Sequence, residues 1–174
     1  MLKWLALLLL SFNACALELT TPGVKRLVMP IPYAFDTGFT NAMRKAAANE
    51  LAAWSEASNG AVTFKRVNQS RLKYGIVFMT ESYGGFANEL TLATTKSDKK
   101  LAGSLIVLNA GVYRWTAGSM LNKVLRHEIG HALGFAHSDD KDSIMYAAYV
   151  DGDRRFSDDD YQGIRAIYNI SHVK

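Results

Sequence analysis

The sequence predicts an α+β fold: a mixed, twisted β-sheet with one long helix across a face, followed by a second helix and a C-terminal helix. Two observations predict it. Residues 26–109 contain five β-rich segments and one segment of helical periodicity, in the order strand, helix and four strands. Residues 119–168 then contain two further segments with helical spacing. This order is typical of a sheet packed against helices in one domain.

The composition supports a single domain and excludes several classes of protein. Of the 174 residues, 49% are hydrophobic and 21% are charged, which suits one core. With 13 Gly, 3 Pro and no low-complexity tract, a collagenous or wholly disordered chain is excluded. The net charge of +4 comes from 20 basic residues scattered among 16 acidic ones. Because these charges form no dense basic stripe, we expect no nucleic-acid binding. We also expect the protein to be a monomer.

Residues 1–16 are predicted to be a secretory signal peptide, which leaves residues 17–174 as the single domain. Lys3 precedes an apolar run at 4–10, and the small-residue site Ala14-Cys15-Ala16 follows. No later stretch reaches the roughly 18 apolar residues of a membrane span, so we expect no stable membrane insertion. The protein is therefore expected to be secreted, extracellular or periplasmic. The alternative is a lipid anchor on Cys15, although residues 12–14 match the required small-residue box poorly.

The first strand and the long helix are predicted from residues 26–60. The run 26–35 is β-rich, but Pro30 and Pro32 cannot donate to a ladder, so it is expected to be an edge or first strand. A helix is predicted from about Thr40 to Ser58, and Asn59-Gly60 ends it. Its apolar positions recur at helical spacing: Phe39, Met43, Ala46, Ala47, Leu51 and Trp54.

Four further strands are predicted between residues 61 and 109. Residues 61–67 alternate in the strand manner, and residues 72–80 contain the apolar run 76–78. Residues 87–95 alternate with polar residues, as suits a sheet edge. The cluster Lys96–Lys100 is expected to be an exposed turn before a last strand at 101–109.

Two helices are predicted in the last third of the chain. The first runs from about Ser119 to Leu133, and the second from Asp158 to Tyr168. Ser157, with Asp160 three residues later, resembles a capping box at the start of the second helix.

The first of these helices carries the candidate chemistry. His127 and His131 are four residues apart, so they share one helix face and can bind one ion. Gly134 stands where the helix should end and can adopt the left-handed conformation that reverses the chain. The reversal would return His137 as a third ligand. Three neutral imidazoles leave the fourth tetrahedral position of Zn²⁺ to water, as in a catalytic site. His172, the remaining histidine, is not expected to be a ligand.

Glu128 follows the first candidate ligand and is placed to act as the catalytic base. Bound zinc lowers the pKa of its water to about 7, so a neighbouring carboxylate can complete the deprotonation as the water attacks a carbonyl. Glu128 can then pass the proton to the leaving amine.

The spacing His-Glu-x-x-His-x-x-Gly-x-x-His resembles the extended zinc signature of the metzincin peptidases, and Ser138 after it is similar to the matrixin branch. Residues 143–146 resemble the matrixin Met-turn, and residues 156–168 resemble its specificity loop and C-terminal helix. Residues 53–55 and 62–67 are also similar to the family's first helix and second strand. Tyr directly follows Met in 143–146, so the Met-x-Tyr of astacins is absent.

The resemblance implies a secreted zinc endopeptidase that hydrolyses peptide bonds of proteins or peptides, with one catalytic zinc. It implies that Met145 forms an apolar floor beneath the metal, and that Tyr146, Ala147 and Tyr149 line the pocket for the side chain after the scissile bond. Asp159 would tie the last helix to the Met-turn. An extended substrate would pair with the edge strand near residues 87–94.

The chain departs from the family pattern in its metal sites. Matrixins usually bind a second, structural zinc through histidines before the active-site helix, but no histidine precedes His127, so this site is expected to be absent. A calcium site is conceivable but unsupported, because the spacing of the available carboxylates follows no recognised calcium loop and favours solvated acidic turns. These carboxylates belong to Asp139, Asp140, Asp142, Asp151 and Asp153.

A catalytically silent, zinc-containing binding module or effector of the same fold is the alternative function. Glu128 favours the peptidase, because a binding protein has no need of a base beside the metal.

Overall fold

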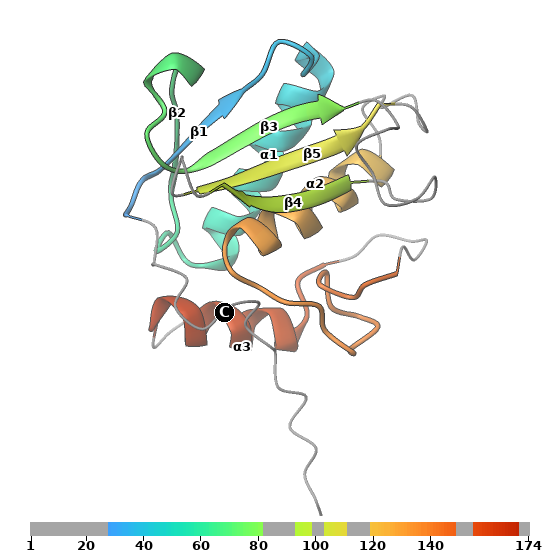
Figure 1. The fold of residues 1–174 in the computed structure, drawn as a ribbon. Coiled ribbons are helices and arrows are strands. Elements are labelled where there is room, and N and C mark those ends of the chain that lie inside the picture. Colours follow the sequence, from blue (N-terminus) through green and yellow to red (C-terminus); the bar gives the residue numbers. More distant parts are fainter. Residues whose placement is uncertain (1–27, 82–92, 99–102, 111–118, 149–154, 171–174) are drawn as a thin grey trace, which may run out of the picture.

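The computed structural model describes most of the chain and confirms the α+β fold (Figure 1). The signal-peptide prediction, Cys15, Tyr149 and His172 lie outside the described residues. Across the described part, no helix is both long enough and apolar enough to cross a membrane. The described residues are 28–81, 93–98, 103–110, 119–148 and 155–170.

A mixed sheet forms one layer of the fold. Its strand order is β2-β1-β3-β5-β4, and β4 runs antiparallel to β5 while the other described pairs are parallel. Among the described strands β4 has one neighbour only, which agrees with the edge position predicted for the fourth strand. The strands are β1 (Ile31–Phe35), β2 (Phe64–Arg66), β3 (Ile76–Glu81), β4 (Ala93–Asp98) and β5 (Gly103–Asn109).

The strand β1 is first in the chain but is not a sheet edge, because β2 and β3 flank it. On the β2 side, Ile31 N donates to Thr63 O at 2.7 Å. On the β3 side, pairing begins only at Tyr33, opposite Ile76. Pro32 precedes that pairing, so its missing N–H costs no ladder bond there.

Several predicted boundaries in the sheet were wrong. The first two strands are shorter than predicted, since β1 begins at Ile31 and β2 covers only Phe64–Arg66. Lys96, Ser97 and Asp98 continue β4 instead of forming a turn, because the antiparallel register with β5 extends to Asp98 opposite Gly103. The strand β3 begins at Ile76, not at Leu72. Gly75, at φ 120°, lies so close to Pro32 O that a Cβ would overlap it. Its left-handed backbone interrupts the extended conformation, so the strand begins one residue later.

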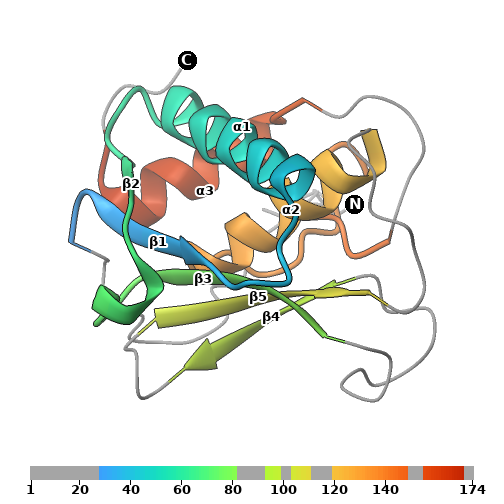
Figure 2. The ribbon, with the colours of Figure 1, turned by 90° about the horizontal axis from the view of Figure 1, so that it is seen from above.

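Two helices cover one face of the sheet and form its core with it. Helix α1 (Asn41–Ala57) and helix α2 (Ser119–Ala132) lie on the same side of the strands (Figure 2). The Thr40 hydroxyl caps α1 by accepting from Met43 N, and Asn59 ends it at φ 51°. The apolar face predicted for the long helix is buried as expected, with Trp54 fully buried. Since α2 contacts both β4 and β5, its residues lie against the open edge of the sheet.

Helix α3 (Asp158–Tyr168) lies beyond α1 and α2, away from the sheet (Figure 1). It has the bounds that the sequence predicts. The Ser157 side chain accepts from Asp160 N, and the Asp160 side chain accepts from Ser157 N, so the capping box is confirmed. Residues 133–148 follow the end of α2 and contain His137, the third candidate ligand.

Candidate metal centre

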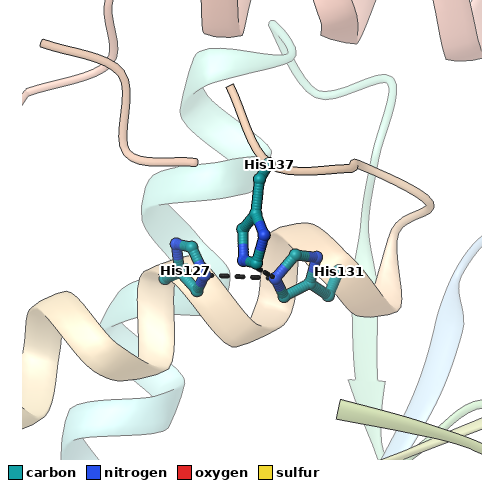
Figure 3. A group of neighbouring side chains, drawn as sticks. All are labelled: His127, His131 and His137. Atoms are coloured by element: carbon teal, nitrogen blue, oxygen red, sulfur yellow. Dashed lines mark hydrogen bonds between the residues drawn. The ribbon is translucent and has the colours of Figure 1, made fainter. Parts of the chain in front are cut away.

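Three histidine side chains converge at the end of α2 (Figure 3). His127 and His131 lie on one face of the helix, and their Nε2 atoms are 3.1 Å apart. Gly134, at φ 102°, reverses the chain after the helix, as predicted. The reversal brings His137 Nε2 to 3.2 Å from His131 Nε2. Within the described residues, these three form the only cluster of three or more potential metal ligands.

Backbone carbonyls set the tautomers of two of these rings. His127 Nδ1 lies 2.8 Å from Ile144 O, and His131 Nδ1 lies 2.8 Å from Phe135 O. A carbonyl only accepts, so each Nδ1 carries the proton and each Nε2 presents a lone pair. Burial lowers the pKa of His131 and thus favours its neutral form. Two Nε2 lone pairs that face each other cannot form a hydrogen bond, so their approach fits a shared cation.

The spacing of the nitrogens fits zinc. Zn–N bonds of about 2.0–2.1 Å at tetrahedral angles place two ligand atoms about 3.3 Å apart. The observed separations of 3.1 Å and 3.2 Å are close to this value. Three imidazoles supply three of four tetrahedral positions, which leaves one for water or substrate, as catalytic zinc sites do. The donor set therefore fits a catalytic zinc ion.

Glu128 is almost completely buried, with 6% of its surface exposed. Burial raises its pKa to about 7, while a hydrogen bond from Thr95 acts in the opposite direction. Thr95 Oγ1 lies 2.6 Å from Glu128 Oε2. No sequence pattern pointed to Thr95, because nothing in a polar edge strand indicates which helix residue it will contact.

Met145 packs beneath the histidine-bearing helix and is fully buried. A Cβ added to Gly130 would overlap Met145 Sδ and would lie 3.0 Å from Trp54 Cζ2. Gly130 therefore allows this close approach between α2 and the Met145 segment. A glycine inside a helix is unfavourable by about 1 kcal/mol relative to alanine, so its presence was a usable signal for close packing.

The segment after the third histidine is fastened to α3 by two adjacent carboxylates. Ser138 N donates to Met145 O at 2.9 Å, which closes the loop between them. Asp159 Oδ2 accepts from Ser138 Oγ at 2.6 Å. Asp160 Oδ2 accepts from Ile144 N at 3.1 Å. Asp160 contacts the Met145 turn directly, and Asp159 reaches it through Ser138, whose backbone pairs with Met145 and Tyr146.

Asp160→Asn is expected to lower the free energy of unfolding by about 1–3 kcal/mol. The carboxylate accepts from Ser143 Oγ, Ile144 N and both polar groups of Ser157. An amide has one oxygen fewer, so its N–H₂ group must face donors in either orientation. Chemical denaturation of the zinc-loaded protein measures the loss.

The matched control is Asp158→Asn, which makes the same chemical change at an exposed position in the first turn of α3. Its expected cost is below about 1 kcal/mol, from the helix dipole alone. Equal losses for the two variants would contradict the role given to Asp160.

The expected pocket residues are only partly within the described chain. Tyr146 is half-buried and forms an isolated bridge with Ser138, next to the third histidine. Ala147 is exposed, and Tyr149 lies outside the described residues. The bridge places the start of the expected pocket beside His137.

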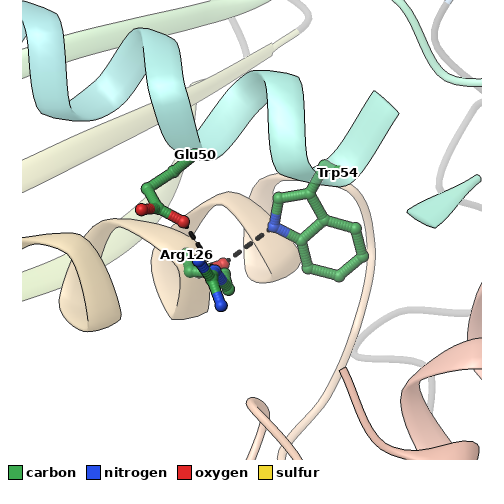
Figure 4. A network of polar contacts seen from close by, with 3 residues as sticks. All are labelled: Glu50, Trp54 and Arg126. Atoms are coloured by element: carbon green, nitrogen blue, oxygen red, sulfur yellow. Dashed lines mark hydrogen bonds and ion pairs between the residues drawn. The ribbon is translucent and has the colours of Figure 1, made fainter. Parts of the chain in front are cut away.

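A polar network joins α1 to α2 one residue before His127 (Figure 4). Arg126 Nε donates to Glu50 Oε2 at 2.5 Å, and Trp54 Nε1 donates to Arg126 O at 3.0 Å. The guanidinium of Arg126 also lies 5.6 Å from the ring centroid of Phe156, just before α3. This network was not predicted from the sequence. The polar Glu50 within the apolar face of the long helix was the available signal.

Comparisons with known proteins agree with this geometry. The profile of the family described as Matrixin matches residues 35–169. Interstitial collagenase of Sus scrofa is 45% identical over 62 residues, which are 33% of this chain and 13% of that protein. Matrilysin of Homo sapiens is 42% identical over 62 residues, 32% of this chain and 23% of that protein. A putative matrix metalloproteinase of Trichoplusia ni ascovirus 2c is 48% identical over 54 residues, 31% of this chain and 10% of that protein. The chain thus matches less than a quarter of each relative's length.

Proposed function

The chain belongs to the matrixin family of zinc metalloendopeptidases, and from this premise we propose that it hydrolyses internal peptide bonds of proteins or peptides. In this proposal His127, His131 and His137 hold one zinc ion, and Glu128 is the catalytic base. The observation that carries the proposal is the convergence of three Nε2 atoms beside a buried carboxylate.

The chemistry is divided between the metal and the chain. Zinc, when bound, supplies a Lewis acid that polarises the carbonyl under attack and lowers the pKa of water to about 7. His127 and His131 would hold it through neutral Nε2 atoms, because the carbonyls of Ile144 and Phe135 occupy their Nδ1–H groups, and His137 would supply the third Nε2. Glu128 takes the proton of the attacking water and returns it to the leaving amine. Its burial supports this role, since a pKa near 7 suits a group that gains and loses a proton at neutral pH.

Substrate binding is proposed at the open edge of the sheet. The strand β4 has a partner on one side only among the described strands, so an extended peptide can add to its other side. Main-chain pairing of this kind provides affinity without much demand on sequence. Selectivity is assigned to a pocket formed by Tyr146, Ala147 and Tyr149, with Met145 as the apolar floor beneath the metal.

The remaining parts of the proposal come from the sequence. We propose secretion through the signal peptide at residues 1–16, a monomer, and a single zinc ion without the structural second zinc. No histidine before His127 is available for that second ion.

Metal removal tests the proposal. The full chain is expressed, purified, assayed for zinc and incubated with casein before and after treatment with a chelator. We expect about one zinc per chain, as for a single catalytic site, and cleavage that stops with the chelator and returns with added zinc. Zinc binding without cleavage of casein or of a broad peptide library would support the silent binding module instead. Absence of bound zinc would overturn the metal centre itself.

A further inference from the structure

The hydroxyl of Thr95 makes a close contact with the proposed base. Its Oγ1 lies 2.6 Å from Glu128 Oε2 and 3.0 Å from the backbone oxygen of the same residue. The hydroxyl has one proton, and the shorter distance lies in the range of a hydrogen bond to an ionised acceptor. The side-chain bond is therefore the stronger of the two interactions.

This contact joins two elements that are remote in sequence. Thr95 lies in β4, opposite Ile106 of β5, and Ile106 is fully buried in the core. Glu128 lies in α2, which packs against β4. The hydroxyl is thus presented by a strand that the sheet holds in place, and not by a flexible loop.

We propose that Thr95 is a positioning residue for Glu128, a proposal that rests on the endopeptidase function proposed above. A glutamate side chain has several rotatable bonds, and restricting them costs up to about 2 kcal/mol. The bond to Oε2 fixes one carboxylate oxygen, and with it the plane of the group, before substrate arrives. Catalysis depends on such fixed geometry, because a misplaced base loses much of its advantage.

The position of Thr95 also links the base to substrate binding. The strand β4, which carries Thr95, is the same edge strand to which we assign the substrate main chain. A substrate that pairs with β4 is therefore placed relative to the base by one rigid element. We therefore expect the loss of the Thr95 hydroxyl to change kcat and not substrate affinity.

The test compares three variants for kcat, KM, zinc content and melting temperature. Thr95→Val removes the hydroxyl but keeps the branched shape suited to a strand. It is expected to lower kcat about 10–100-fold, as for a catalytic group displaced by up to about 1 Å, with KM and zinc content unchanged. Thr95→Ser restores the hydroxyl and is expected to recover most of kcat. Thr80→Val, in β3 of the same sheet, is the matched control and is expected to keep wild-type kcat.

Several outcomes would overturn the proposal. Unchanged kcat in Thr95→Val would do so, as would a loss that Thr95→Ser does not recover, or a loss accompanied by lower zinc content. Crystal structures of the zinc-loaded wild type and Thr95→Val give a readout that needs no turnover. We expect one Glu128 conformer in the wild type and several, or a displaced one, in the variant. The same single conformer in both would refute the positioning role, whereas an inactive wild type alone would contradict only the endopeptidase function.

Discussion

Glu128→Gln is expected to lower kcat/KM for peptide hydrolysis by about 10²–10⁴-fold while zinc stays bound. Glutamine has nearly the same shape as glutamate, and its carbonyl oxygen can still accept the hydrogen bond from Thr95. An amide cannot take a proton from water at neutral pH, so the loss isolates the proton transfer from the packing of α2. Steady-state kinetics with a fluorogenic peptide, together with zinc analysis, measure both parts.

A control variant separates the loss of the catalytic base from the general effect of removing one negative charge. Glu56→Gln makes the same substitution at an exposed position on α1 and should keep wild-type activity. Near-wild-type cleavage by Glu128→Gln would remove this residue from the mechanism. A variant that has also lost its zinc would show instead that Glu128 supports the metal centre structurally.

His131→Asn is expected to abolish stoichiometric zinc binding and, with it, activity and the stabilisation that zinc provides. The Nε2 of His131 lies 3.1 Å from that of His127 and 3.2 Å from that of His137, so its loss leaves two of the three ligand atoms. Asparagine keeps a donor for the Phe135 carbonyl, which His131 Nδ1 contacts at 2.8 Å in the wild type. Zinc present at a thousand times its dissociation constant stabilises a folded protein by about 4 kcal/mol, and the variant should lose most of this increment.

Thermal unfolding with and without added zinc, together with zinc analysis, measures this effect. His172→Asn is the matched control, because it alters the one histidine outside the signature. Its zinc content and its zinc-dependent shift in melting temperature should equal those of the wild type. If His131→Asn still bound one zinc tightly, the three-histidine assignment would be wrong.

Local patterns in the sequence determined a large part of the fold. The bounds of α3 and its capping box follow from Ser157, Asp160 and the apolar spacing after them, and the structure confirms them. The chain reversal at Gly134 was equally readable, because a left-handed residue after a helix is a local requirement. These features depend on residues within a few positions of one another, so periodicity and capping chemistry suffice to predict them.

The grouping of the candidate ligands was predictable for the same reason. His127 and His131 share a face through helix geometry alone. The turn at Gly134, between His131 and His137, then brings His137 back toward them. Their roles as zinc ligands, and that of Glu128 as the base, stay predictions for the experiments above.

Contacts between remote segments were decided only by the tertiary structure. The interior place of β1, the extension of β4 through Asp98 and the direct bond from Ile144 to Asp160 all depend on which partner a segment meets. The bond from Thr95 to Glu128 spans 33 residues and exists because α2 packs under the sheet edge. A sequence determines local conformation through neighbouring side chains, but strand partners and hydrogen bonds across the core are selected by the packing of the whole chain, which no local pattern encodes.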